Sequence, residues 1–291
     1  MGNDISLKNS PFNVSSIRVM SYNVEWGFIT LPNDIKYDAC GHKLPHTKIA
    51  QDTHLKLIAK DIGIVFPDIC FLQEIGSIDA IQLIANNIKN MFNITYKYYY
   101  SNNSETGYQG VGLLIKDTIS EICNVKSIPN FYLNRALCVS FEYNNNIYNI
   151  VGVHLKSLCD GKTEKDTQEQ LGQLAAIYKF CRETENVIIT GDFNNVETSQ
   201  PIQKMNDYKY SNLYDTNFYI PNIVGNDNTE FSAHNNSTEK GSKIDYMFYR
   251  NIKPVSFHII NYQRETIVDN QQYRSETSDH LPILGIFNLL N

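Results

Sequence analysis

Paired cysteines, long apolar stretches and surplus basic charge are all missing from this sequence. The six cysteines lie far apart with no C-x-x-C pair, and several fall inside apolar runs, so we expect reduced, structural thiols. No apolar stretch reaches the roughly 20 residues that a membrane-spanning helix needs. The formal net charge is -6, so no global positive field draws the chain to nucleic acid. A phosphate-rich partner would have to be held by local cations or a bound metal ion.

The first residues also lack the apolar segment of a secretory signal. The sequence therefore predicts an intracellular protein, in the cytoplasm or the nucleus. Residues 1–6 (MGNDIS) fit the M-G-x-x-x-[ST] pattern of N-myristoylation. So short a pattern often matches by chance, and a single acyl chain anchors a protein only weakly. We expect a monomer. Membrane association through an acylated Gly2 is a minor expectation.

What the sequence does contain is the composition of a globular protein. Hydrophobic residues make up 42% of its 291 residues and charged residues 19%, which allows a sizeable core. One or two domains fit this length. No internal repeat and no Pro/Gly/Ser-rich linker divides the chain. We therefore expect a flexible segment at residues 1–15 and a single domain at residues 16–291.

Short β-type runs alternate with a few helical ones. Helical spacing of apolar residues predicts helices from residue 48 to Pro67, at residues 78–91 and at residues 167–182, the last with Leu171, Leu174, Ala175 and Tyr178 on one face. Strands are expected at residues 16–24, 68–73, 96–100, 110–116, 119–126, 136–143, 147–155, 187–190, 243–250, 255–261 and 281–289. The polar stretch at residues 197–242 is expected to be mostly loop. Strand runs interrupted by helices predict two packed sheets with helices outside.

Six segments share one form, in which an apolar run meets polar or charged residues. They are Tyr22-Asn23-Val24-Glu25, Leu72-Gln73-Glu74, Val153-His154-Leu155-Lys156-Ser157, Gly191-Asp192-Phe193-Asn194, Lys243-Ile244-Asp245-Tyr246 and Ser278-Asp279-His280. The ends of strands in one sheet layer can converge on one rim. Carboxylates, amides and imidazoles that are scattered in the sequence can therefore share a pocket.

Taken singly, each segment also has a structural explanation. Glu74 after a buried strand can be a solvated edge or a cap. Asp192 in its turn can satisfy backbone amides, as Asx turns do, and His154 can be a hydrogen-bonded structural histidine. Asp279 and His280, side by side before a strand, are better suited to metal binding and proton transfer. The case for chemistry depends on the six segments together.

In this order, the six segments resemble the endonuclease/exonuclease/phosphatase superfamily, in particular its pancreatic-deoxyribonuclease-like members. The resemblance runs from the Asn23 segment to the His280 segment, nearly the whole chain, and the Gly-Asp-Phe-Asn and Ser-Asp-His motifs are the most specific. It implies an α/β fold, a four-layer α/β/β/α sandwich of two packed mixed β-sheets. It also implies Mg²⁺-dependent hydrolysis of phosphodiesters.

A metal site is part of what the resemblance implies. Asn23 and Glu74 match the metal-site positions of the family, with Glu74 as the main Mg²⁺ ligand and Asp279 as a contributor. A hard cation prefers oxygen ligands, which carboxylates and an Asn amide supply. We therefore expect Mg²⁺ as the cofactor, with Mn²⁺ able to substitute.

The remaining matched residues imply catalytic roles. Asp192 and Asn194 match the pair that orients the attacking water and the phosphate. Asp245 matches the carboxylate that hydrogen-bonds the histidine of the Ser-Asp-His motif, His280, and so holds it for proton transfer or phosphate contact. His154 matches a histidine of the deoxyribonuclease-like branch that is a proton donor or a phosphate ligand.

Two departures from the family pattern leave the branch open. Neutral Gln109 stands where the deoxyribonuclease-like branch has a Glu that supports the first histidine, so His154 lacks its usual charge partner unless Glu105 reaches it. The surrounding Gly-Tyr-Gln-Gly-Val-Gly run is instead similar to that of abasic-site endonucleases, which lack the His-Leu-Lys-Ser segment. Those enzymes place aromatic residues, often Trp, before the Ile-Asp-Tyr strand, where this chain has residues 231–234 (FSAH); its single tryptophan is Trp26.

Three classes of function stay open. A nuclease on DNA, with RNA or abasic sites as other substrates, is favoured, and local phosphate contacts could come from Arg135, Lys156, Lys162 or Lys243. A lipid or inositol-phosphate phosphodiesterase or phosphatase of the same fold is the alternative, because a fold does not fix its substrate. A catalytically inactive binding module is disfavoured, since every matched motif carries a reactive side chain.

Overall fold

The computed structural model of the chain describes residues 15–29, 48–101, 109–129, 131, 134–157, 164–206, 232–235, 240–260, 267–268, 271–272 and 278–289. Several sequence predictions lie outside these residues. They concern Gly2, Glu105, Lys162, the segment at residues 1–14 and most of the expected loop at residues 197–242. One domain over residues 16–291 also stays a prediction.

A six-stranded mixed sheet holds the first half of the described chain together with the last two long strands. Its spatial order is β12 (Lys253–Ile259), β15 (Ile283–Asn288), β1 (Ser16–Gly27), β2 (Ile69–Ile75), β4 (Gly110–Lys116) and β3 (Tyr96–Tyr100). The central strands β1 and β2 are parallel, and the other neighbours are antiparallel. The carboxyl ends of β1 and β2 therefore lie at the same edge of the sheet.

The second sheet has five strands and, like the first, contains one parallel pair. Its spatial order is β11 (Asp245–Arg250), β8 (Asn186–Asp192), β7 (Asn146–His154), β6 (Ala136–Tyr143) and β5 (Cys123–Ser127). The pair β7 and β8 is parallel, with His154 directly opposite Asp192. Two short hairpins pair β9 (Ala233–Asn235) with β10 (Lys240–Ser242) and β13 (Ile267–Val268) with β14 (Gln271–Gln272).

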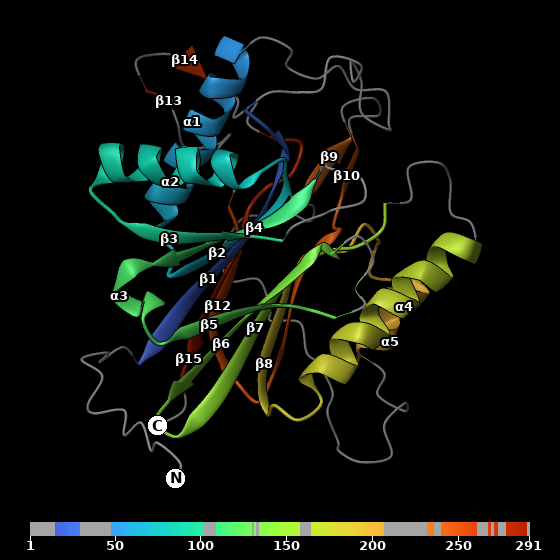
Figure 1. The fold of residues 1–291 in the computed structure, drawn as a ribbon. Helices are drawn as coiled ribbons and strands as arrows, with labels where there is room; N and C mark the ends of the chain where they lie inside the picture. The colour runs from blue at the N-terminus through green and yellow to red at the C-terminus, as the bar shows by residue number, and fades with distance from the viewer. Residues whose placement is uncertain are drawn as a thin grey trace.

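Helices cover the outer faces of the two sheets (Figure 1). Apolar side chains of α1 (Lys48–Val65) and α2 (Ile78–Phe92) pack on the first sheet, and those of α4 (Glu164–Cys181) and α5 (Gln200–Asn206) on the second. A single turn, α3 (Asp117–Ser120), links β4 to β5. The predicted four-layer α/β/β/α sandwich of two mixed sheets is confirmed.

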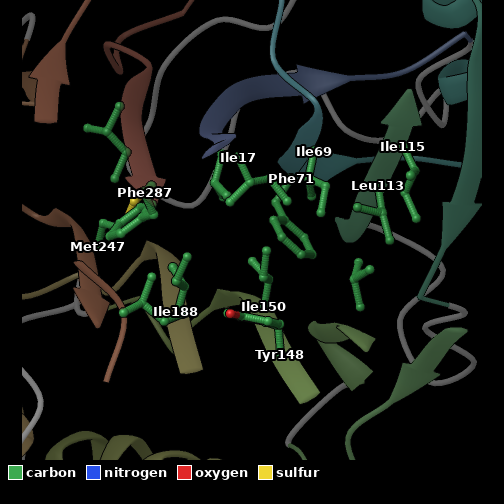
Figure 2. Close-up of a cluster of buried hydrophobic side chains, with 14 of the residues drawn as sticks. Ile17, Ile69, Phe71, Leu113, Ile115, Tyr148, Ile150, Ile188, Met247 and Phe287 are labelled. Carbon is green, nitrogen blue, oxygen red and sulfur yellow. The ribbon is translucent and has the colours of Figure 1, made fainter. Parts of the chain in front are cut away.

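The central layer of the core lies between the two sheets, where alternate residues of their strands face one another. Figure 2 shows the ring of Phe71 from β2 pointing toward Ile150 of β7, with Ile69 and Ile188 nearby. Phe71 is fully buried. Its ring lies directly on the backbone of Gly152, where an added Cβ would stand 1.9 Å from Phe71 Cδ1. The close approach of the two sheets here requires glycine.

We expect Gly152→Ala to lower the free energy of unfolding by about 1–3 kcal/mol, the usual cost of forcing an extra carbon into a packed core. Urea unfolding followed by circular dichroism measures the loss. The control is Gly172→Ala on α4, where an added Cβ meets nothing within 4 Å and helix propensity predicts a gain of about 0.5–1 kcal/mol. Equal midpoints for Gly152→Ala and the wild type would show that Phe71 does not hold the sheets at this distance.

Several elements differ from the sequence predictions. The strand expected at residues 119–126 begins only at Cys123, because α3 occupies residues 117–120. In the stretch expected as loop, α5, β9 and β10 form. The buried residues of α5 are Pro201, Ile202 and Met205, a stripe too short to reveal helical periodicity. Such short elements depend on packing rather than on sequence pattern.

Cysteines and hydropathy behave as the sequence suggests. Among the described residues, Cys70, Cys123, Cys138 and Cys181 are free thiols. Burial raises the pKa of the Cys123 and Cys138 thiols to about 12, so both stay protonated. In the part of the chain that the structure describes, no helix has the length and apolarity to cross a membrane.

Candidate active site

The candidate site lies where the parallel strand pairs of the two sheets end. Asn23 stands near the end of β1, Glu74 near the end of β2, and His154 and Asp192 end β7 and β8. The Nδ2 atom of Asn23 donates hydrogen bonds to Glu74 Oε1 at 3.2 Å and to Asp192 Oδ2 at 2.9 Å. One buried amide therefore ties the first sheet to the second.

A β-bulge turns Glu74 into this site. Strands β2 and β4 pair at Leu72 with Gly112 and again at Ile75 with Gly110, so two residues of β2 stand opposite one of β4. Glu74, inside the bulge, has a φ of 61°. Bulges re-aim side chains next to active sites, and a positive φ in a non-glycine residue is a strained state that persists only where surrounding contacts impose it.

The neighbouring strand β1 of the same sheet bulges at the same level. Its pairing with β2 is interrupted between Asn23 and Gly27, and Glu25 and Trp26 have φ values of 44° and 59°. The Nε2 atom of His54, on α1, lies 2.8 Å from the carbonyl oxygen of Val24 and 3.1 Å from that of Glu25. Because only a protonated nitrogen can bond to carbonyls, His54 carries its proton on Nε2 and anchors the bulge.

The Glu74 carboxylate is surrounded by donors. Besides Asn23, the backbone N–H of Trp26 and the Nε2 of Gln109 donate to its Oε2, at 3.3 and 3.2 Å. Its side chain is 17% exposed. Burial, and next the negative charge of Asp279, raise the pKa of Glu74 to about 7.

Across the site, His280 and Asp245 form a close pair. The Nδ1 of His280 donates to Asp245 Oδ2 at 2.8 Å, and Ser232 Oγ donates to the same oxygen at 2.8 Å. Ser232 Oγ also accepts the backbone N–H of Asp245 at 2.9 Å. Burial by itself would lower the pKa of His280, but the carboxylates of Asp245, Asp279 and Asp192 outweigh it and hold that pKa well above 6.5. His280 is therefore protonated at neutral pH in this arrangement.

Asp192 lies at the centre of the site, in contact with both histidines. Its Oδ2 is 3.7 Å from His154 Nε2 and 3.9 Å from His280 Nε2. The backbone N–H of Asn194 donates to its Oδ1 at 2.7 Å, the Asx turn considered from the sequence. The Asn194 side chain bonds to Leu155 O and to Asp192 Oδ2. Burial raises the pKa of Asp192 to about 7 even though the His280 charge opposes this.

His154 is in a different electrostatic state from His280. Burial, the positive charge of Arg135 and that of His280 put the pKa of His154 well below 6.5, so it is neutral at neutral pH. Its Nε2 faces Asp192 and lies 4.0 Å from Glu74 Oε1. Within the described residues, its buried Nδ1 has no hydrogen-bond partner. Of the two roles that the sequence left open, a neutral imidazole fits a phosphate ligand better than a proton donor.

All eight residues singled out in the sequence belong to this cluster, the eighth being Asp279. Asp279 Oδ1 lies 3.8 Å from His280 Nε2, and its backbone N–H donates to Glu25 Oε2 at 3.1 Å. Ser278 Oγ donates to Asn23 O at 2.7 Å. The Ser-Asp-His segment is thereby fastened to the β1 bulge.

The donor set fits a divalent cation. Glu74, Asp192, Asp245 and Asp279 bring four carboxylates together, an excess of negative charge. Burial first, and a neighbouring carboxylate next, raise the pKa values of Glu74 and Asp192. A hard cation with oxygen ligands would relieve that excess. Glu74 and Asp279 would be its carboxylate ligands. Asn23 Oδ1 accepts the Glu25 N–H at 3.1 Å, so its coordination would require the amide to turn over.

A second donor group overlaps the first. Among the described residues, ligand atoms of Asp192, Asp245 and His280 lie within 4.8 Å of one another, close enough to hold a metal ion. In this structure the group is internally bonded through the His280 and Asp245 pair. This group is a second candidate position for a divalent metal ion.

Sequence reasoning missed several residues that shape the site. Ser232 was placed among substrate-loop residues, yet it is fully buried against Asp245. Gln170 of α4, also fully buried, donates to Lys156 O at 2.8 Å and to Phe193 O at 3.3 Å, and its Oε1 accepts from Asn195 Nδ2 at 2.8 Å. The signal that the sequence offered was the pair of Gln170 and Gln173, three residues apart on one predicted helix.

Of the four cations that the sequence offered as phosphate contacts, the three in the described part of the chain have protein partners. Lys156 Nζ lies 3.9 Å from Asp166, and Lys243 Nζ 3.9 Å from Glu197. Arg135 Nη2 donates to Gln109 Oε1 at 3.2 Å. Of these, Arg135 is tied most closely to the site, since it affects the pKa of His154.

Comparison with known proteins agrees with this geometry. Residues 20–280 match the Endonuclease/Exonuclease/phosphatase family. The chain therefore belongs to this family, whose members are hydrolytic phosphoesterases. No curated protein matches the sequence.

Solved structures show the same fold at low sequence identity. D. rerio TDP2 complexed with single strand DNA product is 16% identical, with 95% of this chain and all of that chain covered and a TM-score of 0.58. An endonuclease/exonuclease/phosphatase from Bacteroides vulgatus is 15% identical, with 95% and 100% coverage and a TM-score of 0.63. ANGEL2, a 2',3'-cyclic phosphatase, is 15% identical, with 94% and 96% coverage and a TM-score of 0.62.

Proposed function

We propose that this chain is a divalent-metal-dependent phosphodiesterase that hydrolyses nucleic acid, with DNA as its preferred substrate. The observation that carries the proposal is the pair of His280 and Asp245, 2.8 Å apart and set beside the carboxylates of Glu74 and Asp192. A protonated imidazole next to oxygen donors for a hard cation is the arrangement that phosphoryl transfer to water needs.

The protein's own groups divide the work as follows. Asp192, with its raised pKa, is suited to accept a proton from water, and Asn194 fixes its carboxylate. His280, protonated and oriented by Asp245, can bind a phosphate oxygen or protonate a leaving group. Glu74 and Asp279 would hold Mg²⁺ or Mn²⁺, which when bound polarises the phosphoryl group and neutralises its charge.

Relatives support nucleic acid as the substrate class. One solved structure of the same fold contains a single-strand DNA product, and another is a 2',3'-cyclic phosphatase in complex with an adenosine vanadate. An activity panel with and without Mg²⁺ tests the choice, using plasmid DNA, abasic duplex, RNA, sphingomyelin and inositol phosphates. Turnover of sphingomyelin or inositol phosphates alone would contradict the proposal in favour of the lipid or inositol-phosphate alternative.

The neutral state of His154 gives a second test. If His154 is a neutral hydrogen-bond ligand, His154→Gln should keep most of the rate on plasmid DNA. His154→Ala should lose about 13- to 160-fold, equivalent to one hydrogen bond to a charged phosphate of about 1.5–3 kcal/mol. Initial rates on plasmid and abasic duplex measure the effect. Losses of about 10²- to 10⁴-fold in both variants would instead identify His154 as a proton donor.

A further inference from the structure

Gln109 connects a cation of the second sheet to the candidate metal ligand of the first. It immediately precedes β4 of the first sheet, and Arg135 immediately precedes β6 of the second. Arg135 Nη2 donates to Gln109 Oε1 at 3.2 Å, and Gln109 Nε2 donates to Glu74 Oε2 at 3.2 Å. The amide thus carries a hydrogen-bond relay from guanidinium to carboxylate.

Chemistry fixes the direction of this relay. An ionised carboxylate can only accept hydrogen bonds, and a guanidinium can only donate them. The amide must therefore turn its NH₂ toward Glu74 and its oxygen toward Arg135. Neither Glu nor Met offers both a donor and an acceptor at this length, so glutamine matches the two neighbours in a way that its nearest replacements do not.

The backbone on both sides of the relay is constrained. Gln109 has a φ of 57° and Glu74 a φ of 61°, both in the region that non-glycine residues seldom adopt. The residue after Gln109 is Gly110, which pairs with Ile75, and an added Cβ on it would stand 2.3 Å from the Tyr100 ring. The close packing at Gly110 therefore fixes the backbone position of Gln109, and the bulge in β2 fixes the backbone position of Glu74.

We propose that Gln109 is a positioning residue, whose amide holds the Glu74 carboxylate in the orientation that binds the divalent cation. The inference rests on the proposed metal-dependent function. Groups that orient a metal ligand typically change metal affinity or activity by about 10- to 100-fold when they are lost. The Gln109 relay also explains why His154 does not bond to residue 109: the amide is engaged by Glu74 and Arg135.

Isothermal titration of Mg²⁺ and of Mn²⁺ into the full-length protein tests this without relying on turnover. Gln109→Met keeps the length of the side chain and removes both hydrogen bonds, and Gln109→Asn keeps the amide but is too short to span both partners. We expect each variant to raise the metal Kd by about 10- to 100-fold. The rate at saturating metal should change little, since the ligand itself is intact.

Two controls separate positioning from general loss of structure. Asn149, on β7 five residues before His154, carries another buried amide, which is bonded to Ser140 Oγ at 2.6 Å and to Thr184 Oγ1 at 2.7 Å. Asn149→Leu removes this amide and should lower stability but leave the metal Kd unchanged. In a Glu74→Gln background, Gln109→Met should have no further effect on the Kd, because the carboxylate that it orients is gone.

The outcomes are distinct. A Gln109 variant that folds, as circular dichroism shows, and binds metal with the wild-type Kd overturns the inference while the proposed function stands. The same holds if Gln109→Met weakens binding equally with and without the Glu74 carboxylate. A wild-type protein that neither binds Mg²⁺ or Mn²⁺ nor hydrolyses any phosphodiester overturns the proposed function and this inference together.

Discussion

His280→Ala is expected to lower turnover by about 10²- to 10⁴-fold, the range for losing a group that transfers a proton in the transition state. The imidazole lies within 4 Å of Asp192 and Asp279 and is bonded to Asp245, and it is the protonated histidine of the site. Initial rates on plasmid DNA and on a small-molecule phosphodiester measure the loss. His258→Ala, on the edge strand β12 and outside the cluster described above, is the matched control and should leave the rate unchanged.

Asp245→Asn refines the same prediction. The amide can still accept from His280 Nδ1, but it lacks the negative charge that is the leading cause holding the pKa of His280 above 6.5. The pKa of His280 should therefore fall. If protonated His280 is the active form, the alkaline limb of the pH–rate profile moves to lower pH, and the maximal rate falls less than in His280→Ala. Full activity of both folded variants on every substrate would show that this pair takes no part in the reaction.

The sequence was sufficient to group the eight candidate residues that the structure brings together, but not to find supporting residues such as Ser232 and Gln170 or the geometry of the cluster. Polar residues at the ends of apolar runs identified Asn23, Glu74, Asp192 and His280, because strand ends share a rim. The bulges that turn Glu74 inward leave no trace in the pattern, since neither Glu74 nor Gln109 is a glycine although both have positive φ. Only the pairing of complete strands imposes those conformations.

The face of α4 shows why polar residues mislead a reading of periodicity. Apolar spacing predicted a buried face with Leu171, Leu174 and Ala175. In the structure Leu174 is buried as expected, but Gln170 and Gln173 are buried beside it. Leu171 is only half-buried and Ala175 is exposed, so the buried face is rotated from the expected one. The reason is hydrogen bonding: Gln170 donates to Lys156 O and Gln173 accepts from Lys156 N, at the end of β7. Helix α4 therefore supports the active-site segments as well as the core.

The electrostatics of the site make metal binding and protonation compete. Glu74 has a pKa of about 7 without a cation, and a metal ion binds only the ionised form. Binding should therefore release a proton, and the apparent affinity should fall by about tenfold for each pH unit below 7. Above pH 7 the affinity should level off. Such a profile distinguishes a buried carboxylate from an ordinary surface one, whose affinity would change only near pH 4.

Glu74→Gln removes the charge while it keeps the size of the side chain. We expect the Mg²⁺ Kd to rise by at least the 10- to 100-fold that loss of a merely supporting group costs, because this carboxylate is the predicted main ligand. The dependence of Kd on pH between 5 and 7 should flatten, since the titrating group is gone. Calorimetry at pH 5.5, 6.5 and 7.5 measures both effects, and the rate on plasmid DNA should fall in parallel. Glu142→Gln, an exposed carboxylate on β6, is the control and should behave as the wild type. An unchanged Mg²⁺ Kd in Glu74→Gln would exclude Glu74 as the ligand and leave the group of Asp192, Asp245 and His280 as the position to test. Wild-type rates in excess EDTA would contradict metal dependence altogether.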